Sequence, residues 1–551
     1  MKNNSSKILI LIIAVIVINF LATKAYKRFD LTKDKRYTLS ETTHNILENI
    51  DEPAIVTVYL EGDFPSEFKR LQTETKQHLE ELKAINKHIK FRFIEPLDQA
   101  EELIKQGLQP SRLSVQENGK VSEAVIFPWA TIEYNNKIEN ISLLANQTNG
   151  TQEDQLQSSI QNLEYTFTDA VHKISSEKKQ KIAILRGNGE LDDIYLTGFG
   201  LQLRQYYKLA PFTLDSVSKN PQKAVQQLTE YDLVIIAKPS ERFSEEEKFT
   251  LDQYIMNDGK SLWLIDNINA ELDSLMQTGE TLAFNRDLNL TDQLFSYGVR
   301  INYDLVKDIQ SSTIRLASGN TGNQTQYQDF PWHYHPLVMP QNNHQITNNI
   351  GQVSLRFSST IDTLKNGIDK TILLQSSEYS KPLGTPRLIA LNEVAKKPSQ
   401  KDYDNGNKTM GVLLEGEFSS AYANRIKPFE TNLYKDKSNH NKMVVIADGD
   451  IIANQVFQGQ PLDLGLDKWT KIRYDNASFL MNTINYMLDD SGLLKLRSKS
   501  IQLQFLDKQK AFKERTYWQL LNVILPLILL AIFGFLFNYL RKRKFATLQN
   551  S

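Results

Sequence analysis

The chain has 551 residues, with 64 Lys and Arg against 65 Asp and Glu, a formal net charge of -1 and no cysteine. The balanced charge excludes the broad basic surface that nucleic-acid binding needs, so we expect no DNA or RNA partner. The lack of cysteine excludes disulfides, thiolate nucleophiles, Cys-ligated zinc and iron–sulfur clusters. The length suits about three domains of ~150 residues, or one large α/β domain and a smaller one.

Two apolar segments bracket the chain, Ile8 to Ala22 and Tyr517 to Leu540. The second carries no charge and, at a rise of ~1.5 Å per residue, is long enough to cross a hydrocarbon core of ~30 Å. The first is shorter and contains Asn19, so it is either an anchor that crosses a locally thinned bilayer or a cleaved signal peptide. We therefore predict a transmembrane anchor in residues 1–25 and a transmembrane helix in residues 517–540.

Basic residues near these segments indicate how the chain lies in the lipid bilayer. Arg541 to Lys544 follow the second segment, and Lys2 and Lys7 precede the first, with no acidic residue among them. Short positively charged flanks favour the cytoplasmic side. Lys24, Lys27 and Arg28 on the inner flank weaken this asymmetry, although long domains cross the membrane largely regardless of charge. We predict an inner-membrane protein with a periplasmic body and cytoplasmic termini, the basic tail being residues 541–551.

A small α/β domain is expected over residues 36–150. Ile55 to Leu60 and Ile89 to Ile94 alternate as strands do, and Glu67 to Lys87 has helical apolar spacing, which together predict a β-α-β unit. Ser40 is a candidate N-cap of a preceding short helix. Further short strands are predicted at Leu113 to Val115, Ala124 to Phe127 and Thr131 to Tyr134. A long helix over Thr151 to Ser175 is expected to form a connection, residues 151–180, to the next domain.

Continuous apolar runs mark a second α/β domain over residues 181–495. The four runs are Lys181 to Leu185, Tyr231 to Ala237, Ser261 to Ile265 and Met443 to Ala447. Such runs are typical of strands covered on both faces, which favours an open, mostly parallel sheet of flavodoxin-like type.

Local signals mark helix ends within this region. Ser244 and Glu247 predict a capping box, and Gly259 suits the C′ position of the same helix. Leu355 to Ala421 is β-rich and is either an insertion or an edge sheet. Asn476 to Leu488 is predicted to be a closing helix, followed by a juxtamembrane linker in residues 496–516.

Sequence motifs for catalysis are missing. The chain has no G-x-x-x-x-G-K-[ST], G-x-S-x-G or H-E-x-x-H sequence, so we expect neither ATP hydrolysis by this chain nor serine or zinc hydrolase chemistry. We predict no catalytic residue, cofactor or metal, and therefore a protein that is not an enzyme.

Two loops are candidates for ligand binding. Gly187-Asn188-Gly189-Glu190 follows a predicted strand, where its glycines either let a ligand approach or form a tight turn. Asp448-Gly449-Asp450 and Asp266 follow two other strands at the edge where open α/β sheets bind ligands. These carboxylates either form an acidic rim that holds a cation or belong to ordinary turns.

Two further groups of residues have special chemistry. His333 and His335 would point the same way in an extended strand, and with Asp329 they suggest a metal site, although an aromatic packing loop is the simpler interpretation. Within the second apolar segment, Asn522 and Pro526 are unusual in lipid and suggest contact with another membrane protein, although Asn522 near the interface would also be hydrated.

Several stretches in order resemble a known family, the gliding-motility-associated ABC transporter component GldG of Bacteroidetes. The stretches are Asp30-Leu31-Thr32, Arg36 to Ser40, Tyr59 to Pro65, Tyr297 to Arg300, Phe330 to Leu337, Leu496 to Lys499 and Trp518 to Asn522 with Pro526. The resemblance implies an auxiliary, substrate-binding subunit that works in gliding motility beside a separate ABC permease and ABC ATPase. A glycan- or peptide-binding extracytoplasmic module is the alternative, and a hydrolase has no supporting nucleophile.

The resemblance also implies a fold for the central region. It is similar to a domain of a ciliary intraflagellar-transport subunit and to class I glutamine-amidotransferase-like folds. Those amidotransferases use a cysteine nucleophile, which this chain lacks. Asn188 also stands where the resembling family usually has a histidine, which argues against acid–base chemistry in that loop.

Overall fold

The computed structural model describes residues 13–15, 30, 38–62, 66–117, 120–145, 152–321, 324–340, 344–488, 492–497, 510 and 513–546. The chain divides into two compact units, Met1–Ser500 and Ile501–Ser551. The first apolar segment lies outside the described residues except for 13–15, as does most of the predicted linker. The described part is a mixed α/β structure with several sheets.

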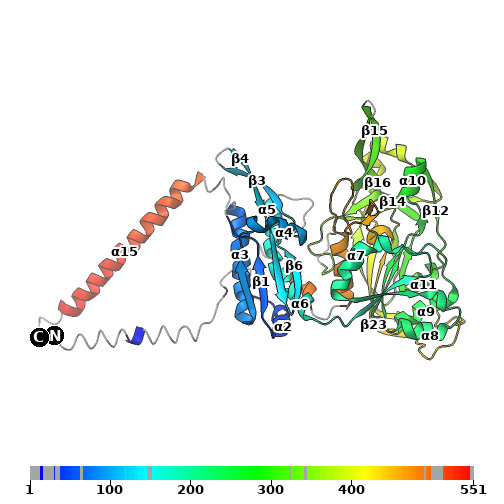
Figure 1. The fold of residues 1–551 in the computed structure, drawn as a ribbon, viewed down its shortest axis with the longest axis horizontal. Helices are drawn as coiled ribbons and strands as arrows, with labels where there is room; N and C mark the ends of the chain where they lie inside the picture. Colours follow the sequence, from blue (N-terminus) through cyan, green and yellow to red (C-terminus); the bar gives the residue numbers. More distant parts are fainter. Residues whose placement is uncertain are drawn as a thin grey trace. The chain divides into compact units, whose positions relative to one another are not determined.

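The first sheet has the strand order β2-β1-β5-β6 (Figure 1). Its strands are β1 (Ala54–Val58), β2 (Ile89–Phe93), β5 (Trp129–Tyr134) and β6 (Lys137–Ser142). β1 and β2 are parallel and joined by α3 (Ser66–Ile85), so the predicted β-α-β unit is confirmed. The Ser40 side chain accepts a hydrogen bond from Thr43 N at the start of α2 (Glu41–Glu48), as predicted. β3 (Ser111–Glu117) and β4 (Lys120–Ile126) form a separate hairpin.

The predicted long helix over Thr151 to Ser175 is two helices, α5 (Gln152–Gln161) and α6 (Leu163–Ser175). Asn162 between them has ψ 0°, which departs from the helical value near -42° and interrupts the regular geometry. The helices pack on the first sheet, and Lys173 on α6 contacts Glu139 on β6 at 3.0 Å. The prediction of one continuous helix was therefore wrong. The sequence could not show the break, because Asn162 occupies one position between the two helices and the apolar residues on either side keep their helical spacing.

The central sheet has seven strands in the order β19-β22-β23-β10-β9-β7-β8. Its strands are β7 (Lys181–Arg186), β8 (Lys208–Thr213), β9 (Leu233–Ala237), β10 (Lys260–Leu264), β19 (Asp369–Gln375), β22 (Thr409–Ser419) and β23 (Lys437–Ile446). β8, β7, β9, β10 and β23 run parallel to one another. The four apolar runs therefore form adjacent parallel strands, as predicted. β19 and β22 extend the sheet in antiparallel pairing.

Helices cover both faces of the central sheet (Figure 1). α7 (Asp193–Tyr206) and α12 (Asn476–Leu488) pack in one apolar cluster, and α8 (Pro221–Leu228), α9 (Glu245–Met256) and α11 (Thr291–Tyr297) pack in the other. Alternate residues of β9 belong to opposite clusters, because successive strand side chains point to opposite faces. The closing helix has the predicted bounds.

The segment Leu355 to Ala421, predicted to be either an insertion or an edge sheet, contributes strands both to the central sheet and to smaller sheets. β19 and β22 join the edge of the central sheet, whereas the strands between and before them pair elsewhere. The smaller pairings join β11 (Ile268–Asn269), β12 (Glu280–Asn285) and β21 (Arg387–Ala390); β13 (Val299–Ile301) and β18 (Ile361–Thr363); β14 (Asp304–Asp308) and β20 (Ser380–Gly384); and β15 (Ser311–Thr321), β16 (Gln324–Val338) and β17 (Val353–Ser354). The segment is thus partly an edge and partly an insertion.

Remaining elements are short. They are α4 (Ala100–Lys105), α10 (Leu272–Thr278), α13 (Leu493–Arg497), β24 (Val456–Phe457) and β25 (Gln460–Pro461), with single 3₁₀ turns at Leu97–Gln99, Leu214–Ser216, Leu391–Ala395, Gln400–Asp402 and Asp450–Ile452.

The helix α9 has the predicted capping box, in which Ser244 accepts from Glu247 N and the Glu247 side chain accepts from Ser244 N. Its end differs from the prediction for Gly259. Asp258, with φ 70°, is the left-handed residue. Gly259 has another role, because a Cβ there would overlap the ring of Tyr254. The small residue is needed for close packing rather than for a left-handed turn.

The second unit contains one long helix, α15 (Arg515–Ala546). A stretch of 18 residues within Arg515–Arg543 has mean hydropathy 2.7 and is not buried in the structure, so by length and composition the helix can cross a membrane. The predicted span, residues 517–540, lies inside it, as do Asn522 and Pro526. Among the residues that the structure describes, this is the single helix of that kind.

Candidate functional site

A buried lysine at the carboxyl end of β9 organises the edge of the central sheet. Lys238 is 8% exposed, and its Nζ lies 2.8 Å from Asp450 Oδ1, 2.9 Å from Glu271 Oε2 and 3.5 Å from Asp266 Oδ2. Gly449 makes room for it, because a Cβ at that residue would lie 2.5 Å from Lys238 Cγ. Lys238 was not predicted as a site residue from the sequence, although it follows an apolar strand just as Asp266 does.

Of the three aspartates predicted at the strand ends, Asp266 and Asp450 contact this lysine, and Asp448 accepts a hydrogen bond from the backbone of Asp450 beside them. β10 and β23 pair with Leu264 opposite Ile446, so Asp266 and Asp448 follow at equivalent positions. Asp266 Oδ1 accepts a hydrogen bond from Gly449 N at 2.5 Å. Carboxylates therefore gather at this edge, as one alternative of the prediction had it. The cation between them is the Lys238 ammonium group rather than a metal ion.

Asp448 supports the backbone of this edge. It is fully buried, and it accepts hydrogen bonds from Arg356 N at 2.5 Å and from Asp450 N at 2.7 Å. Both carboxylate oxygens are thus used to fix neighbouring chain segments. This geometry is that of a structural turn residue, and Asp448 does not line the cavity described below.

Burial and charge set the protonation of the cluster. Burial raises the pKa of Asp266 to about 6, partly opposed by the Lys238 ammonium. Burial, with Asp266 and Asp450 nearby, raises the pKa of Asp448 well above its ordinary value. Burial acts in the same direction on Asp450, but Lys238 and Arg356 outweigh it and lower its pKa. Burial alone would lower the pKa of Lys238, yet the surrounding carboxylates raise it. The cluster is a compact ion pair in which Lys238 and Asp450 stay charged.

The glycine-rich loop lies elsewhere, beside the connection from β9 to α9. Gly187 and Gly189 have φ 115° and 67°, a left-handed backbone that favours glycine. The carbonyl of Asn188 accepts hydrogen bonds from Ser240 N and Glu241 N, both at 2.9 Å. Glu190 Oε2 accepts from Asn188 N at 2.9 Å, and burial raises its pKa. The loop does not meet the aspartates and does not line the cavity, so its geometry is that of a tight packing turn.

A cavity of about 620 Å³ opens at the same strand ends. Lys238, Glu271 and Asp450 from the charged cluster form one wall. Other walls come from α7, β15, β16, the residues after β17, the segment after the 3₁₀ turn Asp450–Ile452 and the start of α12. They include Tyr195, Arg315, His335, Arg356, Asn454, Trp469, Tyr474 and Asn476. Small-ligand sites typically have volumes of about 300–1,000 Å³ and lie at this edge of open α/β sheets.

The histidine pair does not form the suggested metal site. His333 Nδ1 lies 3.1 Å from Asp308 O and 3.2 Å from Ser311 Oγ, whereas His335 lines the cavity. The irregular pairing of β15 with β16 near Ser311 breaks the simple alternation expected of a strand. Asp329 makes a two-point contact with Arg315, at 2.7 and 2.8 Å. The described residues contain no group of three metal-ligating side chains.

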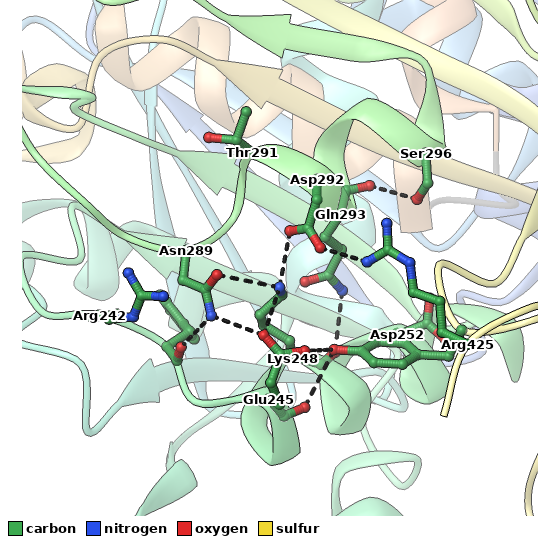
Figure 2. A network of polar contacts seen from close by, with 12 residues as sticks. Arg242, Glu245, Lys248, Asp252, Asn289, Thr291, Asp292, Gln293, Ser296 and Arg425 are labelled. Carbon is green, nitrogen blue, oxygen red and sulfur yellow. Dashed lines mark hydrogen bonds and ion pairs between the residues drawn. The ribbon is translucent and has the colours of Figure 1, made fainter. Parts of the chain in front are cut away.

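A second buried polar network holds neighbouring elements of the fold together. Lys248 on α9 is 1% exposed, and its Nζ lies 3.1 Å from Glu245 Oε1 and 2.9 Å from Asp292 Oδ1. Figure 2 shows how these side chains point toward one another. Asp292 also pairs with Arg425 at 2.6 Å, and buried Asp252 accepts from Ser420 Oγ at 2.6 Å. The network ties α9 and α11 to residues 420–425, and none of its labelled residues lines the cavity.

By its fold, the chain is a mixed α/β protein with a cavity at the strand ends of its central sheet and, among the described residues, one candidate membrane helix. The chain belongs to the family described as an ABC-type uncharacterized transport system, whose model matches residues 179–483, more than half of its length. This family suggests an auxiliary component of an ABC-type transport system that associates with other transporter components. A family described as a domain of unknown function matches residues 33–133.

Two individual proteins are also similar. An uncharacterized protein of Borreliella burgdorferi is 22% identical over 545 residues, covering 94% of each chain. A solved structure of the mmIFT52 N-terminal domain is 14% identical and covers 59% of this chain and 100% of its own, with a TM-score of 0.34. We draw no structural conclusion from a likeness at that TM-score.

Proposed function

We propose that this protein is a non-enzymatic, membrane-anchored auxiliary subunit of an ABC transporter, of the substrate-binding kind, that works beside a separate ABC permease and a separate ABC ATPase. The family match over residues 179–483 is the observation that carries the proposal. The resemblance of the separated stretches to GldG supports gliding motility as the process. We further propose that Asn522 and Pro526 on α15 contact a partner helix, because polar and helix-breaking groups in lipid are satisfied by neighbouring protein.

The proposed arrangement places the body in the periplasm and both termini in the cytoplasm, in the inner membrane. The basic residues after the apolar part of α15, Arg541 to Lys544, support a cytoplasmic C-terminus. The first apolar segment would be a second anchor. A body tied to the membrane stays close to its partners, which raises its effective concentration at them.

Affinity purification in mild detergent tests the assembly. The full chain should be recovered with a permease and an ATPase, identified by mass spectrometry. Asn522→Leu should reduce their recovery, whereas Asn538→Leu, in the same helix but nearer its basic end, should not. Recovery as a lone subunit, under conditions that keep other transporter complexes intact, would contradict the proposal.

Binding of a glycan or peptide by the body is a second candidate function. It needs a pocket, and the cavity at the strand ends supplies one. Of the residues predicted from the sequence, Asp450 lines this cavity, whereas Asp266, Asp448 and the loop Gly187 to Glu190 do not. Since Asp448 holds two backbone amides, Asp448→Ala is expected to lower the melting temperature. Loss of ligand binding at an unchanged melting temperature would instead indicate a direct role in binding.

A further inference from the structure

The cavity at the strand ends contains a buried histidine with an unused nitrogen. His335 on β16 is 3% exposed, and its Nε2 has no hydrogen-bond partner among the described residues. Its ring packs edge-on against Phe357, with centroids 5.2 Å apart. Burying a polar group without a partner costs free energy, so such a group in a cavity wall indicates that a ligand supplies the partner. Burial lowers the pKa of His335 to about 3, so the ring is neutral and offers a hydrogen bond.

An arginine without an ion-pair partner lies in the same cavity. The backbone of Arg356 is fixed by Asp448, and its side chain lines the cavity. Within the described part of the chain, its guanidinium makes no ion pair or side-chain hydrogen bond. Of the other basic side chains on the walls, Lys238 pairs with Asp450 and Arg315 with Asp329, whereas Lys468 lies over the Trp469 ring, with its Nζ 5.4 Å from the ring centroid. Arg356 therefore has its hydrogen-bond donors available for a ligand.

The walls around these two groups are held in place without a ligand. The Asn476 side chain accepts from Ser354 N at 2.9 Å and donates to Ser354 O at 2.8 Å. The Asn454 side chain accepts from Gly198 N at 2.8 Å. Trp469, 47% exposed, offers an aromatic surface at the cavity. The site is thus formed in advance, which lowers the entropic cost of binding.

We propose that the cavity binds a small organic carboxylate, with Arg356 as its two-point partner and His335 Nε2 as a second hydrogen-bonding group. The planar guanidinium matches the geometry of a carboxylate, which it binds with two parallel hydrogen bonds. Among the carboxylates of the wall, Glu271 and Asp450 are engaged by Lys238, and Asp467 accepts hydrogen bonds from Gln455 and Thr470. The Arg356 guanidinium is therefore available to a carboxylate of the ligand. This inference deepens the second candidate function. Its test measures ligand binding alone, so it fails or succeeds independently of assembly with transporter subunits.

Titration calorimetry on the full chain in detergent tests the site. The probes are D-glucuronate, N-acetylglycine and succinate, each beside an uncharged counterpart: D-glucose, N-acetylglycinamide and succinamide. The three acids distinguish a sugar acid, a peptide-like carboxylate and a dicarboxylate. At least one acid should bind saturably, and its counterpart at least about 10-fold more weakly, because a charged hydrogen-bonded pair is lost.

Variants assign the binding to the cavity. Arg356→Gln should weaken binding of that acid by about 10-fold or more, and His335→Gln should also weaken it. Arg300→Gln is the matched control, because Arg300 pairs with Asp362 on β18 and lies outside the cavity. The control should bind as the parent chain does. Equal binding of acids and counterparts, no binding of any acid, or unchanged binding by a folded Arg356→Gln variant would each overturn the proposal.

Discussion

His335 makes the stability of the body depend on pH. Its pKa in the folded chain is about 3, whereas an unfolded histidine titrates near ~6.5. Below about pH 6.5, His335 binds a proton in the unfolded chain but not in the folded chain, so protonation favours unfolding. The contribution of the neutral His335 ring to stability is therefore complete above that pH and is lost as the pH falls toward 3. Between pH 7 and pH 5 the parent chain should lose about 2 kcal/mol more than His335→Gln.

Urea unfolding followed by tryptophan fluorescence at several pH values measures this difference. His440→Gln is the control, because His440 is exposed on β23. It should leave the pH dependence of the parent chain unchanged. An identical slope for the parent chain and His335→Gln would contradict the account of the buried neutral ring.

Lys238 is expected to stabilise the fold through the carboxylates around it. Lys238→Met would leave Asp450 and Asp266 buried without their cation, a loss of about 3–5 kcal/mol. Lys437→Met removes an exposed pair with Glu417 at 2.6 Å, which should cost much less because solvent screens the two charges. Free energies of unfolding for the two variants separate the effects. Losses of equal size would show that the cluster does not depend on Lys238.

The sequence predicted part of this site. Asp266, Asp448 and Asp450 were found because carboxyl ends of adjacent parallel strands meet at one edge. Lys238 occupies the same position after β9, but its side chain had no sequence signal that distinguished it from a surface lysine. His335 was singled out in the sequence because it forms a pair with His333, which suggested a metal site. The irregular pairing of β15 with β16 means that the two side chains do not point the same way, as a metal site would require.

At the scale of elements, two glycines allow a matched prediction. Gly259, between α9 and β10, has no space for a Cβ beside Tyr254, so Gly259→Ala should destabilise by about 1–3 kcal/mol. Gly200 lies within α7, where a Cβ would have no neighbouring atom within 4 Å, so Gly200→Ala should stabilise by about 1 kcal/mol through helix propensity. Thermal unfolding checks both signs. A stabilising Gly259→Ala would refute the packing explanation.

Strands of the central sheet could be predicted where the apolar runs were continuous. They could not be predicted where strand pairing depends on residues that are distant in the sequence. The runs that became β7, β9, β10 and β23 are buried on both faces, which gives an unambiguous pattern. β8 was missed because Pro211 interrupts it, and proline is tolerated there since β8 is the edge strand. The antiparallel position of β19 and β22 depends on which strand lies beside them, which local spacing does not encode.

At the scale of the whole molecule, the chain combines an α/β body with α15, a helix long and apolar enough to span a bilayer. The family match accounts for residues 179–483, and α15 lies outside that range. The proposed function joins the two parts, since a transporter auxiliary subunit must stay at the membrane. The proposed function requires the body and the basic tail to lie on opposite sides of that membrane.

Cysteine labelling tests this claim most directly, because the chain has no cysteine of its own to react. Tyr327→Cys places a thiol on the exposed β15–β16 hairpin, at a residue 65% exposed, and Lys542→Cys places one after the apolar part of α15. With a membrane-impermeant maleimide on intact spheroplasts, Tyr327→Cys should be labelled and Lys542→Cys only after lysis. Labelling of Lys542→Cys with Tyr327→Cys protected until lysis would contradict the account.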